Sequence, residues 1–347
     1  MIAFAAALLL AAAPAGASEI ERELAGIVDL FYGLDFAGSK AAADRLTAAH
    51  PGHPAGPFYQ SLAAYQRFLA DEEGRAESLS EFEKLSAVAV ETARVWASTS
   101  AVESEYYAGA ARGFRGRVFA AQRKYLRALP EALKSVRHCK KALRLDATLE
   151  DVYLGLGMYH YYRARLPAAA KPFALLLTGE RADAEQGLAE LRRVAERGGP
   201  ARMEARSVLA AIYASDYEQR WDEAEKLLAE LMERYPRNPL YRLRRVYAAE
   251  RRGAFAQAAA LADPDGPWIA ALDAALRRST RAAALYRAAE AALLAGRPRE
   301  ASARLDALAA ESPSDDLKPW IARRRQELRR RHAPSEPKPW LGLEVPR

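Results

Sequence analysis

A spacing that recurs along the chain constrains the fold of these 347 residues more than any other sequence feature. Intervals of three, four, three and five residues separate the members of three sets that lie far apart in the chain. The sets are Phe36, Ser39, Ala43, Leu46 and Pro51; Trp221, Ala224, Leu228, Leu231 and Pro236; and Pro298, Ala301, Leu305, Leu308 and Pro313. Intervals of three and four place the first four members on one helix face, and the proline ends that helix. A unit that recurs in this way is typical of stacked repeat proteins.

The recurring unit resembles the tetratricopeptide repeat, in which about 34 residues form two antiparallel helices. The second and third sets match the second helix of that repeat best, and Gly253, Phe255 and Ala258 match the turn and the start of another second helix. The resemblance extends over most of the chain. It implies an all-α fold without β-sheet, in which antiparallel helix pairs stack into an α-solenoid with a right-handed superhelix. It also implies about seven helix pairs plus a capping helix across residues 18–332, and binding of a protein or peptide.

The charged residues are nearly balanced outside one segment. Lys and Arg number 52, and Asp and Glu number 45, which gives a net charge of +7. Six arginines and one glutamate from Arg323 to Arg331 contribute +5 of that excess. Because a nucleic-acid surface would spread cations along one face, we expect no nucleic-acid partner. We interpret the arginine run as a solvated last helix, and peripheral contact with an anionic envelope surface or an acidic partner is the alternative.

The first residues have the features of a secretory signal peptide. Residues Ile2 to Ala13 are all apolar, and Pro14 and a stretch of small residues ending at Ala17 follow them. Twelve helical residues span about 18 Å, which is short of a hydrocarbon core of about 30 Å. We therefore expect cleavage after Ala17, so that residues 1–17 are removed, and export to the periplasm or cell envelope; retention as an anchor is the alternative. The remaining chain has one cysteine, Cys139, and so cannot form an internal disulfide.

Two other segments depart from the repeating pattern. Residues 171–177, with the sequence Lys-Pro-Phe-Ala-Leu-Leu-Leu, form an apolar insertion. We expect the insertion to plug one end of a groove or to pack between repeat units. Residues 333–347 contain four prolines and are expected to form a flexible tail.

Two central stretches carry patterns that point to a binding site. Within residues 103–124, Gly109, Gly113, Gly116 and Ala120 form a stripe of small residues. Since glycine within a helix costs about 1 kcal/mol relative to alanine, the stripe predicts that another helix or a ligand approaches closely. Residues 151–162 are apolar or aromatic nearly all round, which predicts a central buried helix. Buried tyrosine hydroxyls need partners, so part of this aromatic set is expected to line a groove.

The sequence contains no motif that indicates catalysis or a cofactor. It has no Walker loop, dinucleotide-binding glycine pattern, His-Glu-x-x-His or nucleophile elbow. His50 and His53 share a turn but lack a third metal ligand. We therefore expect a non-catalytic adaptor or scaffold, with no metal or cofactor, that binds a protein or peptide on the concave face of the solenoid. The candidate contacts are tyrosines, arginines and a histidine, the first two being usual interface anchors: Tyr106, Arg112, Arg115, Tyr153, Tyr159, His160 and Tyr162.

Two other functions fit the same sequence. A lipid or an envelope glycan could bind in a groove formed by the aromatic stretch and the apolar insertion. A scaffold could also self-associate through the ends of the solenoid. A closed apolar cavity beside Tyr159 and Phe173 would favour a ligand-binding protein, whereas an open groove of mixed charge would favour the adaptor.

Overall fold

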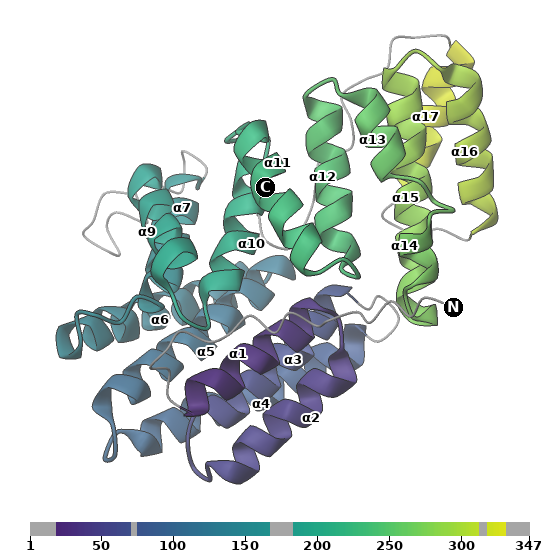
Figure 1. Ribbon diagram of the computed structural model, residues 1–347. Coiled ribbons are helices and arrows are strands. Elements are labelled where there is room, and N and C mark those ends of the chain that lie inside the picture. Colours follow the sequence, from purple (N-terminus) through teal and green to yellow (C-terminus); the bar gives the residue numbers. More distant parts are fainter. Residues whose placement is uncertain (1–18, 71–74, 167–182, 312–317, 331–347) are drawn as a thin grey trace, which may run out of the picture.

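The computed structural model describes residues 19–70, 75–166, 183–311 and 318–330 (Figure 1). These ranges contain sixteen helices and no strand, so the predicted all-α class is confirmed. The predicted signal peptide, the apolar insertion of residues 171–177 and the predicted tail of residues 333–347 lie outside the described residues. The helices are α1 (Glu19–Tyr32), α2 (Phe36–Ala49), α3 (Ala55–Ala70), α4 (Arg75–Trp96), α5 (Ala101–Ala121), α6 (Tyr125–Leu145), α7 (Val152–Ala164), α9 (Ala184–Arg197), α10 (Arg202–Tyr213), α11 (Trp221–Arg234), α12 (Pro239–Arg251), α13 (Phe255–Leu261), α14 (Pro267–Ala270), α15 (Ala274–Leu294), α16 (Pro298–Ala310) and α17 (Lys318–Arg330).

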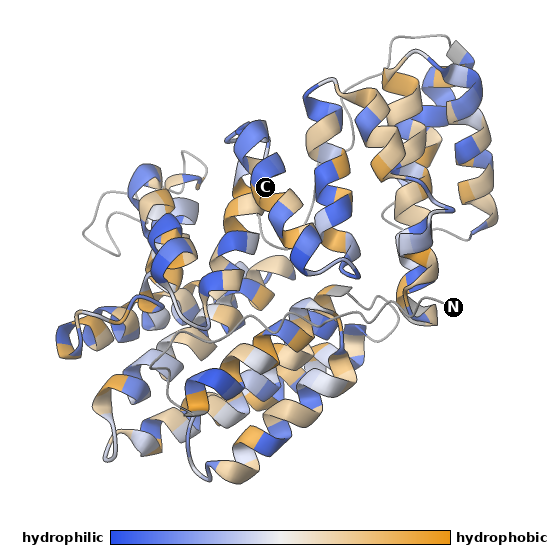
Figure 2. Cartoon of the chain, in the orientation of Figure 1, coloured by the Kyte–Doolittle hydropathy of each residue, from blue (hydrophilic) through white to orange (hydrophobic). Residues whose placement is uncertain are grey.

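The recurring sequence spacing forms the buried side of three helices. The buried residues of α2 are Ser39, Ala43 and Leu46, those of α11 are Ala224, Leu228 and Leu231, and those of α16 are Ala301, Leu305 and Leu308. The small member of each set allows close approach of the neighbouring helix, and the leucines fill the space beside it. The remaining faces of the helices are polar, and in Figure 2 each long helix carries both hydrophilic and hydrophobic residues.

The same tight turn recurs before five of the helices. Leu34, Arg123, Gln219, Gly253 and Gly296 have positive φ, and each lies two residues before the start of α2, α6, α11, α13 or α16. In four of these turns the next residue donates its N–H to the carbonyl five residues earlier, as in a Schellman motif. The turn folds the following helix back beside the preceding one.

Consecutive helices pack on each other along the chain, and some contacts also join helices that are not consecutive. In addition to the pairs α1–α2, α3–α4, α5–α6, α7–α9, α10–α11, α12–α13 and α15–α16, contacts join α1 to α3, α3 to α5, α5 to α7 and α12 to α15. Figure 1 shows this order as a continuous path from the N-terminal helices, in purple, to α16 and α17 at the other end. The core is therefore drawn out along the path of the chain.

Long-range contacts bring α1 back to the middle of the chain. The Asn238 side chain donates to the carbonyl of Tyr32 at 3.0 Å. Asp29 accepts from the Tyr235 hydroxyl at 2.6 Å and forms an ion pair with Arg234 at 2.8 Å. Because these partners lie at the turn between α11 and α12, α1 is held against the middle of the chain.

Candidate functional site

A cavity of about 1180 Å³ lies among the helices between α1 and α10. Its walls come from α1, α3, α5, α6 and α7 and from the start of α10. Most of the lining side chains are apolar or aromatic, among them Phe31, Phe58, Leu62, Phe114, Val136, Leu154 and Met158. Cavities that bind small molecules are mostly apolar, contain a few polar groups and have about 300–1,000 Å³, so this cavity has room for a large ligand.

Helix α5 presents one continuous face to the cavity. Tyr106, Ala110, Gly113, Arg117 and Ala120 line it at intervals of four, three, four and three residues, which is the spacing of one helix face. Because three of the five side chains are small, they leave room beside the helix. All four residues of the predicted small-residue stripe, Gly109, Gly113, Gly116 and Ala120, line the cavity.

The glycine stripe also packs closely against α6. A Cβ atom added at Gly109 would lie 3.1 Å from the Cβ atom of His138 and 3.3 Å from the sulfur of Cys139. The carbonyl of Gly109 accepts from the Ser135 hydroxyl at 2.7 Å. Glycine at this position therefore lets α5 and α6 approach closely, and both helices continue into the cavity wall.

One charged cluster forms part of the cavity wall. Arg117 pairs with Glu204 at the start of α10, and the same carboxylate accepts from the Tyr32 hydroxyl. The Arg117 guanidinium lies 5.4 Å from the ring centroid of Tyr65 and 5.1 Å from that of Phe114, distances at which cation–π attraction operates. This cluster joins α1, α5 and α10 across the cavity.

A second polar group of the wall is the carboxylate of Asp151. It accepts from the backbone N–H groups of Gly199 at 2.7 Å and Ala201 at 3.2 Å, just before α10. Burial nonetheless raises the pKa of Asp151, and the two backbone hydrogen bonds only partly offset that effect. Burial, followed by the nearby charge of Asp151, also raises the pKa of Tyr106 well above its ordinary value. The Tyr106 hydroxyl is therefore neutral and able to donate a hydrogen bond.

Exposed hydrophobic side chains mark the mouth of the cavity. Leu126 is 93% exposed, and Tyr125, Leu129, Leu166 and Tyr217 are exposed as well. All five also line the cavity. Because an apolar patch on a soluble surface is typical of a binding site, the mouth is the expected entry for an apolar ligand.

Three of the seven predicted contact residues lie on the cavity wall. Tyr106 projects from α5, and Tyr159 and Tyr162 from α7. They come from helices that the sequence pattern had singled out, one for its small residues and the other for its aromatic residues. The three tyrosines are therefore placed to contact a bound molecule.

Two of the other predicted residues, Arg112 and Arg115, lie away from the cavity and bind Glu131 of α6. The nearest nitrogen–oxygen distances to that carboxylate are 3.2 Å and 3.7 Å, respectively. Arg115 also donates to the hydroxyl of Ser86 at 3.1 Å. Both guanidinium groups thus join helices within the chain.

The remaining two, Tyr153 and His160, join α7 to α9. The Arg193 guanidinium lies 4.1 Å from the ring centroid of Tyr153. The Nδ1 atom of His160 lies 2.7 Å from a carboxylate oxygen of Glu190. Neither residue lines the cavity.

The cavity offers no reactive nucleophile or metal site within the described part of the chain. Cys139 lines the wall, and burial raises its pKa to about 12, so the sulfur stays protonated near neutral pH. The described residues contain no group of three or more His, Cys, Asp and Glu side chains that could hold a metal ion. The site is thus suited to binding an apolar molecule and to donating or accepting a few hydrogen bonds.

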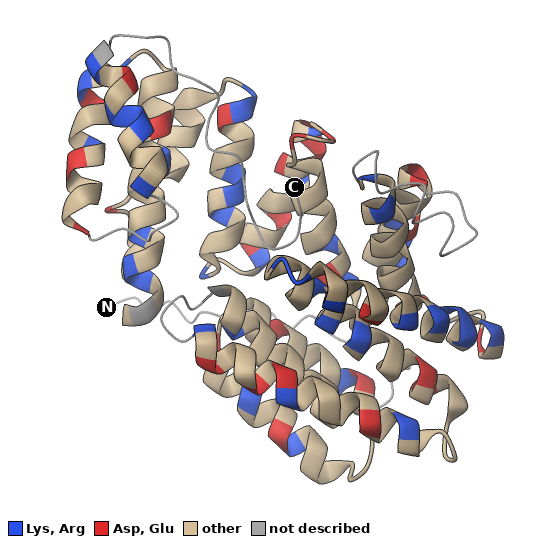
Figure 3. Ribbon diagram, turned by 180° about the vertical axis from the view of Figure 1, so that it is seen from behind, with Lys and Arg blue, Asp and Glu red and all other residues tan. Residues whose placement is uncertain are grey.

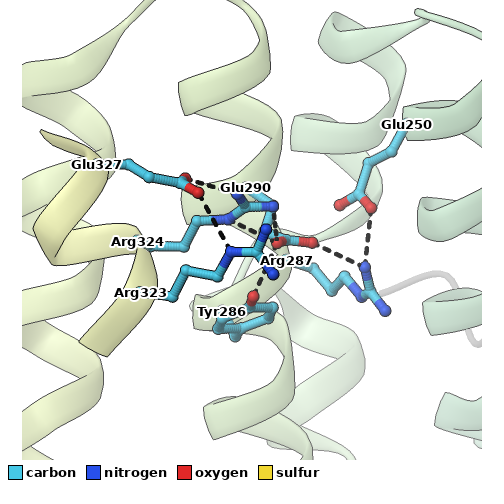
Figure 4. Close-up of polar contacts among 7 residues, drawn as sticks. All are labelled: Glu250, Tyr286, Arg287, Glu290, Arg323, Arg324 and Glu327. Carbon is cyan, nitrogen blue, oxygen red and sulfur yellow. Dashed lines mark hydrogen bonds and ion pairs between the residues drawn. The ribbon is translucent and has the colours of Figure 1, made fainter. Parts of the chain in front are cut away.

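Arg324 of the last helix takes part in a buried ionic network (Figure 4), whereas Arg323 and Arg329 are exposed as expected. Arg324 is only 1% exposed and pairs with Glu290 and Glu327, each at 2.7 Å. Arg287 pairs with Glu290 at 3.0 Å and with Glu250 at 2.9 Å. Arg324 therefore joins α17 to α15, which differs from the solvated side chain that we expected at this position.

Comparison with known proteins does not assign the chain to a family. The sequence matches no protein-family model and no curated protein. In the described ranges, every helix is too short or too polar to cross a membrane.

Proposed function

We propose that the protein is an exported α-solenoid of tetratricopeptide-like helix pairs that binds a lipid with a long acyl chain in its central cavity. Three observations support the solenoid: the recurring buried spacing, the recurring turn and the contacts that join α1 to α3, α3 to α5 and α5 to α7. The signal-peptide pattern of residues 1–17 supports export.

The observation that carries the proposed activity is the size and lining of the cavity. The cavity opens to solvent between exposed apolar side chains, so water contacts its apolar wall unless a ligand covers it. Removing apolar surface from water contributes about 25 cal/mol per Å², so a ligand that covers this wall gains binding free energy from it. Water fills cavities that offer it several polar partners, whereas rings and aliphatic chains surround this one. An acyl chain makes more favourable contacts with these apolar side chains than water does.

The few polar groups of the wall would orient the ligand. Gln66, Tyr106, Asp151 and Arg117 all line the cavity, and each presents a donor or acceptor. A polar headgroup can hydrogen-bond to part of this set while the chain lies against the aliphatic residues of α6 and α7.

The test is to identify what the purified chain carries and whether a blocked cavity loses it. Native mass spectrometry and solvent extraction of the full chain from its cell envelope should release a lipid at close to one equivalent. Ala110→Trp places a large ring on the cavity face of α5 and should reduce the bound lipid at least tenfold. Ala303→Trp, at an exposed position of α16, is the matched control and should retain it. Equal lipid content in both variants, or an extract without lipid, would contradict the proposal.

A second candidate function is the adaptor expected from the repeat resemblance. The specific observation in its favour is the exposed set of Tyr125, Leu126 and Tyr217 at the cavity mouth, because aromatic residues are enriched at protein interfaces. A partner would insert an apolar side chain or helix there. In the same purification, a stoichiometric protein that is lost on Ala110→Trp, in the absence of bound lipid, would establish the adaptor.

A further inference from the structure

An excess of positive charge lies on α6 and the two residues before it. Residues 123–145 contain eight Lys and Arg and a single acidic residue, a net charge of +7 that equals the net charge of the whole chain. Figure 3 shows these cations as repeated blue bands along α6. The cations of this segment are Arg123, Lys124, Arg127, Lys134, Arg137, Lys140, Lys141 and Arg144.

Most of these charges are available to a partner. Six of the eight have no carboxylate within ion-pair distance in the part of the chain that the structure describes; Lys141 pairs with Glu105 at 2.6 Å, and Lys140 also interacts within the chain. The one acidic residue of the segment, Glu131, is itself neutralised by Arg112 and Arg115 of α5. The field outside α6 is therefore strongly positive.

The two sides of α6 differ sharply in character. The buried side consists of Ala128, Ser135, Val136, Cys139 and Ala142, a set of mostly small side chains. The opposite side combines cations with leucines.

Leu126, Leu133, Arg137 and Arg144 follow each other at intervals of seven, four and seven residues, so they lie along one line of that outward side. Arg137, Arg144 and Leu126 are exposed, and Leu126 reaches 93%. A helix with a basic outward face and exposed apolar side chains is typical of segments that lie on an anionic membrane surface.

We propose that α6 docks the protein onto an anionic lipid bilayer, with Leu126 inserted and the cations against the headgroups. Charge complementarity selects the anionic surface, since each cation near such a surface strengthens binding about fivefold. The exposed leucines favour a bilayer over a nucleic acid, because phosphates offer no apolar contact to a side chain such as Leu126. The inference goes beyond the proposed function, because docking through α6 does not require a ligand in the cavity. It also places the cavity mouth, which Tyr125, Leu126 and Leu129 line, against the membrane.

The test is sedimentation of the full chain with vesicles of phosphatidylcholine alone or with one quarter phosphatidylglycerol, at 150 mM salt. The triple variant Lys134→Gln, Arg137→Gln and Arg144→Gln should bind the anionic vesicles roughly 100-fold more weakly. Leu126→Ser should weaken binding about tenfold, since an inserted leucine loses its apolar contact. Leu126 is almost fully exposed, so this substitution leaves the fold intact.

The matched control removes three charges of the same kinds elsewhere. Lys226, Arg237 and Arg299 are exposed and lie in or beside α11 and α16. Their simultaneous replacement by Gln should change vesicle binding less than threefold.

The proposal is overturned if the chain ignores anionic vesicles or if both triple variants lose binding equally. It is also overturned if duplex DNA binds more tightly than the vesicles and Leu126→Ser has no effect, which would assign α6 to a nucleic acid. Vesicle binding by a chain that carries no lipid in its cavity would support docking while contradicting the proposed function, so the two can fail separately.

Discussion

The apolar cavity predicts how affinity depends on the length of a bound acyl chain. Each methylene group that moves from water into an apolar site contributes about 0.8 kcal/mol, which corresponds to about fourfold in the dissociation constant. Saturated fatty acids of 10, 12, 14 and 16 carbons keep the headgroup constant and vary only the chain. We expect each step of two carbons to tighten binding about 15-fold. Titration calorimetry of the delipidated protein measures this series directly.

The volume of the cavity sets the chain length at which the affinity should stop increasing. At roughly 30 Å³ for each methylene-sized group, a chain of 16 carbons fills about 480 Å³. This is less than half of the 1180 Å³ available, so affinity should rise through the whole series without a plateau. Burial of the chain should also make the heat-capacity change of binding more negative at each step.

Two results would refute this reasoning. A gain below about twofold per methylene would mean that the chain lies on the surface, where only part of it leaves water. A plateau at 10 or 12 carbons would mean that the ligand occupies a site much smaller than the cavity. Ala110→Trp provides the internal control, because the added ring should lower the affinity for every chain in the series.

Four further predictions concern other parts of the structure. Arg287→Met removes the cation that the Glu290 carboxylate and the Glu250 carboxyl group share, and should lower the free energy of unfolding by about 3–5 kcal/mol in urea titrations. Glu250→Gln should cost less than about 1 kcal/mol, because a neutral amide resembles the protonated carboxyl group that burial favours. Because burial raises the pKa of Glu250, the folded protein takes up a proton there, so stability should fall as pH rises above about 4.5, and Glu250→Gln should remove that slope. The thiol of Cys139, with its pKa raised to about 12, should resist iodoacetamide at pH 8 until the chain unfolds, as followed by mass spectrometry. Gly187→Ala would place a Cβ atom 2.5 Å from a backbone nitrogen of α7 and should cost about 1–3 kcal/mol, whereas Gly26→Ala in open space should stabilise α1 by up to about 1 kcal/mol in thermal denaturation.

The helical pairing was predictable because its causes are local. The three-four spacing of residues such as Ala224, Leu228 and Leu231 depends only on helix geometry, and these residues are buried as predicted. Boundaries depend on weaker signals. Helix α15 begins at Ala274, where the Asp273 side chain caps it by accepting from the backbone N–H of Leu276 at 3.0 Å.

The candidate site was predictable only in part, because it depends on contacts between distant segments. The small residues of α5 and the tyrosines of α7 showed that something approaches those helices, and Tyr106, Tyr159 and Tyr162 line the cavity. The sequence carried no signal that Tyr32 and Glu204, 172 residues apart, would meet at its wall. The cations of α6 can be counted in the sequence, but which of them face outward depends on how α6 packs. The denser arginine run at the end of the chain includes the buried Arg324.

The return of α1 to the middle of the chain explains why local helix pairs enclose a cavity. A stack of pairs that only touched their neighbours would leave the inner faces of α3, α5 and α7 in an open groove. Here Asp29 contacts Arg234 and Tyr235, and Tyr32 contacts Glu204, so α1 closes the open side of that groove. A ligand that touches both Tyr32 and the wall formed by α5 and α7 gains its full contact area only when α1 is in place. Binding and closure are therefore linked: whatever fills the cavity stabilises the contacts of α1, and the loss of those contacts would weaken binding by the same free energy.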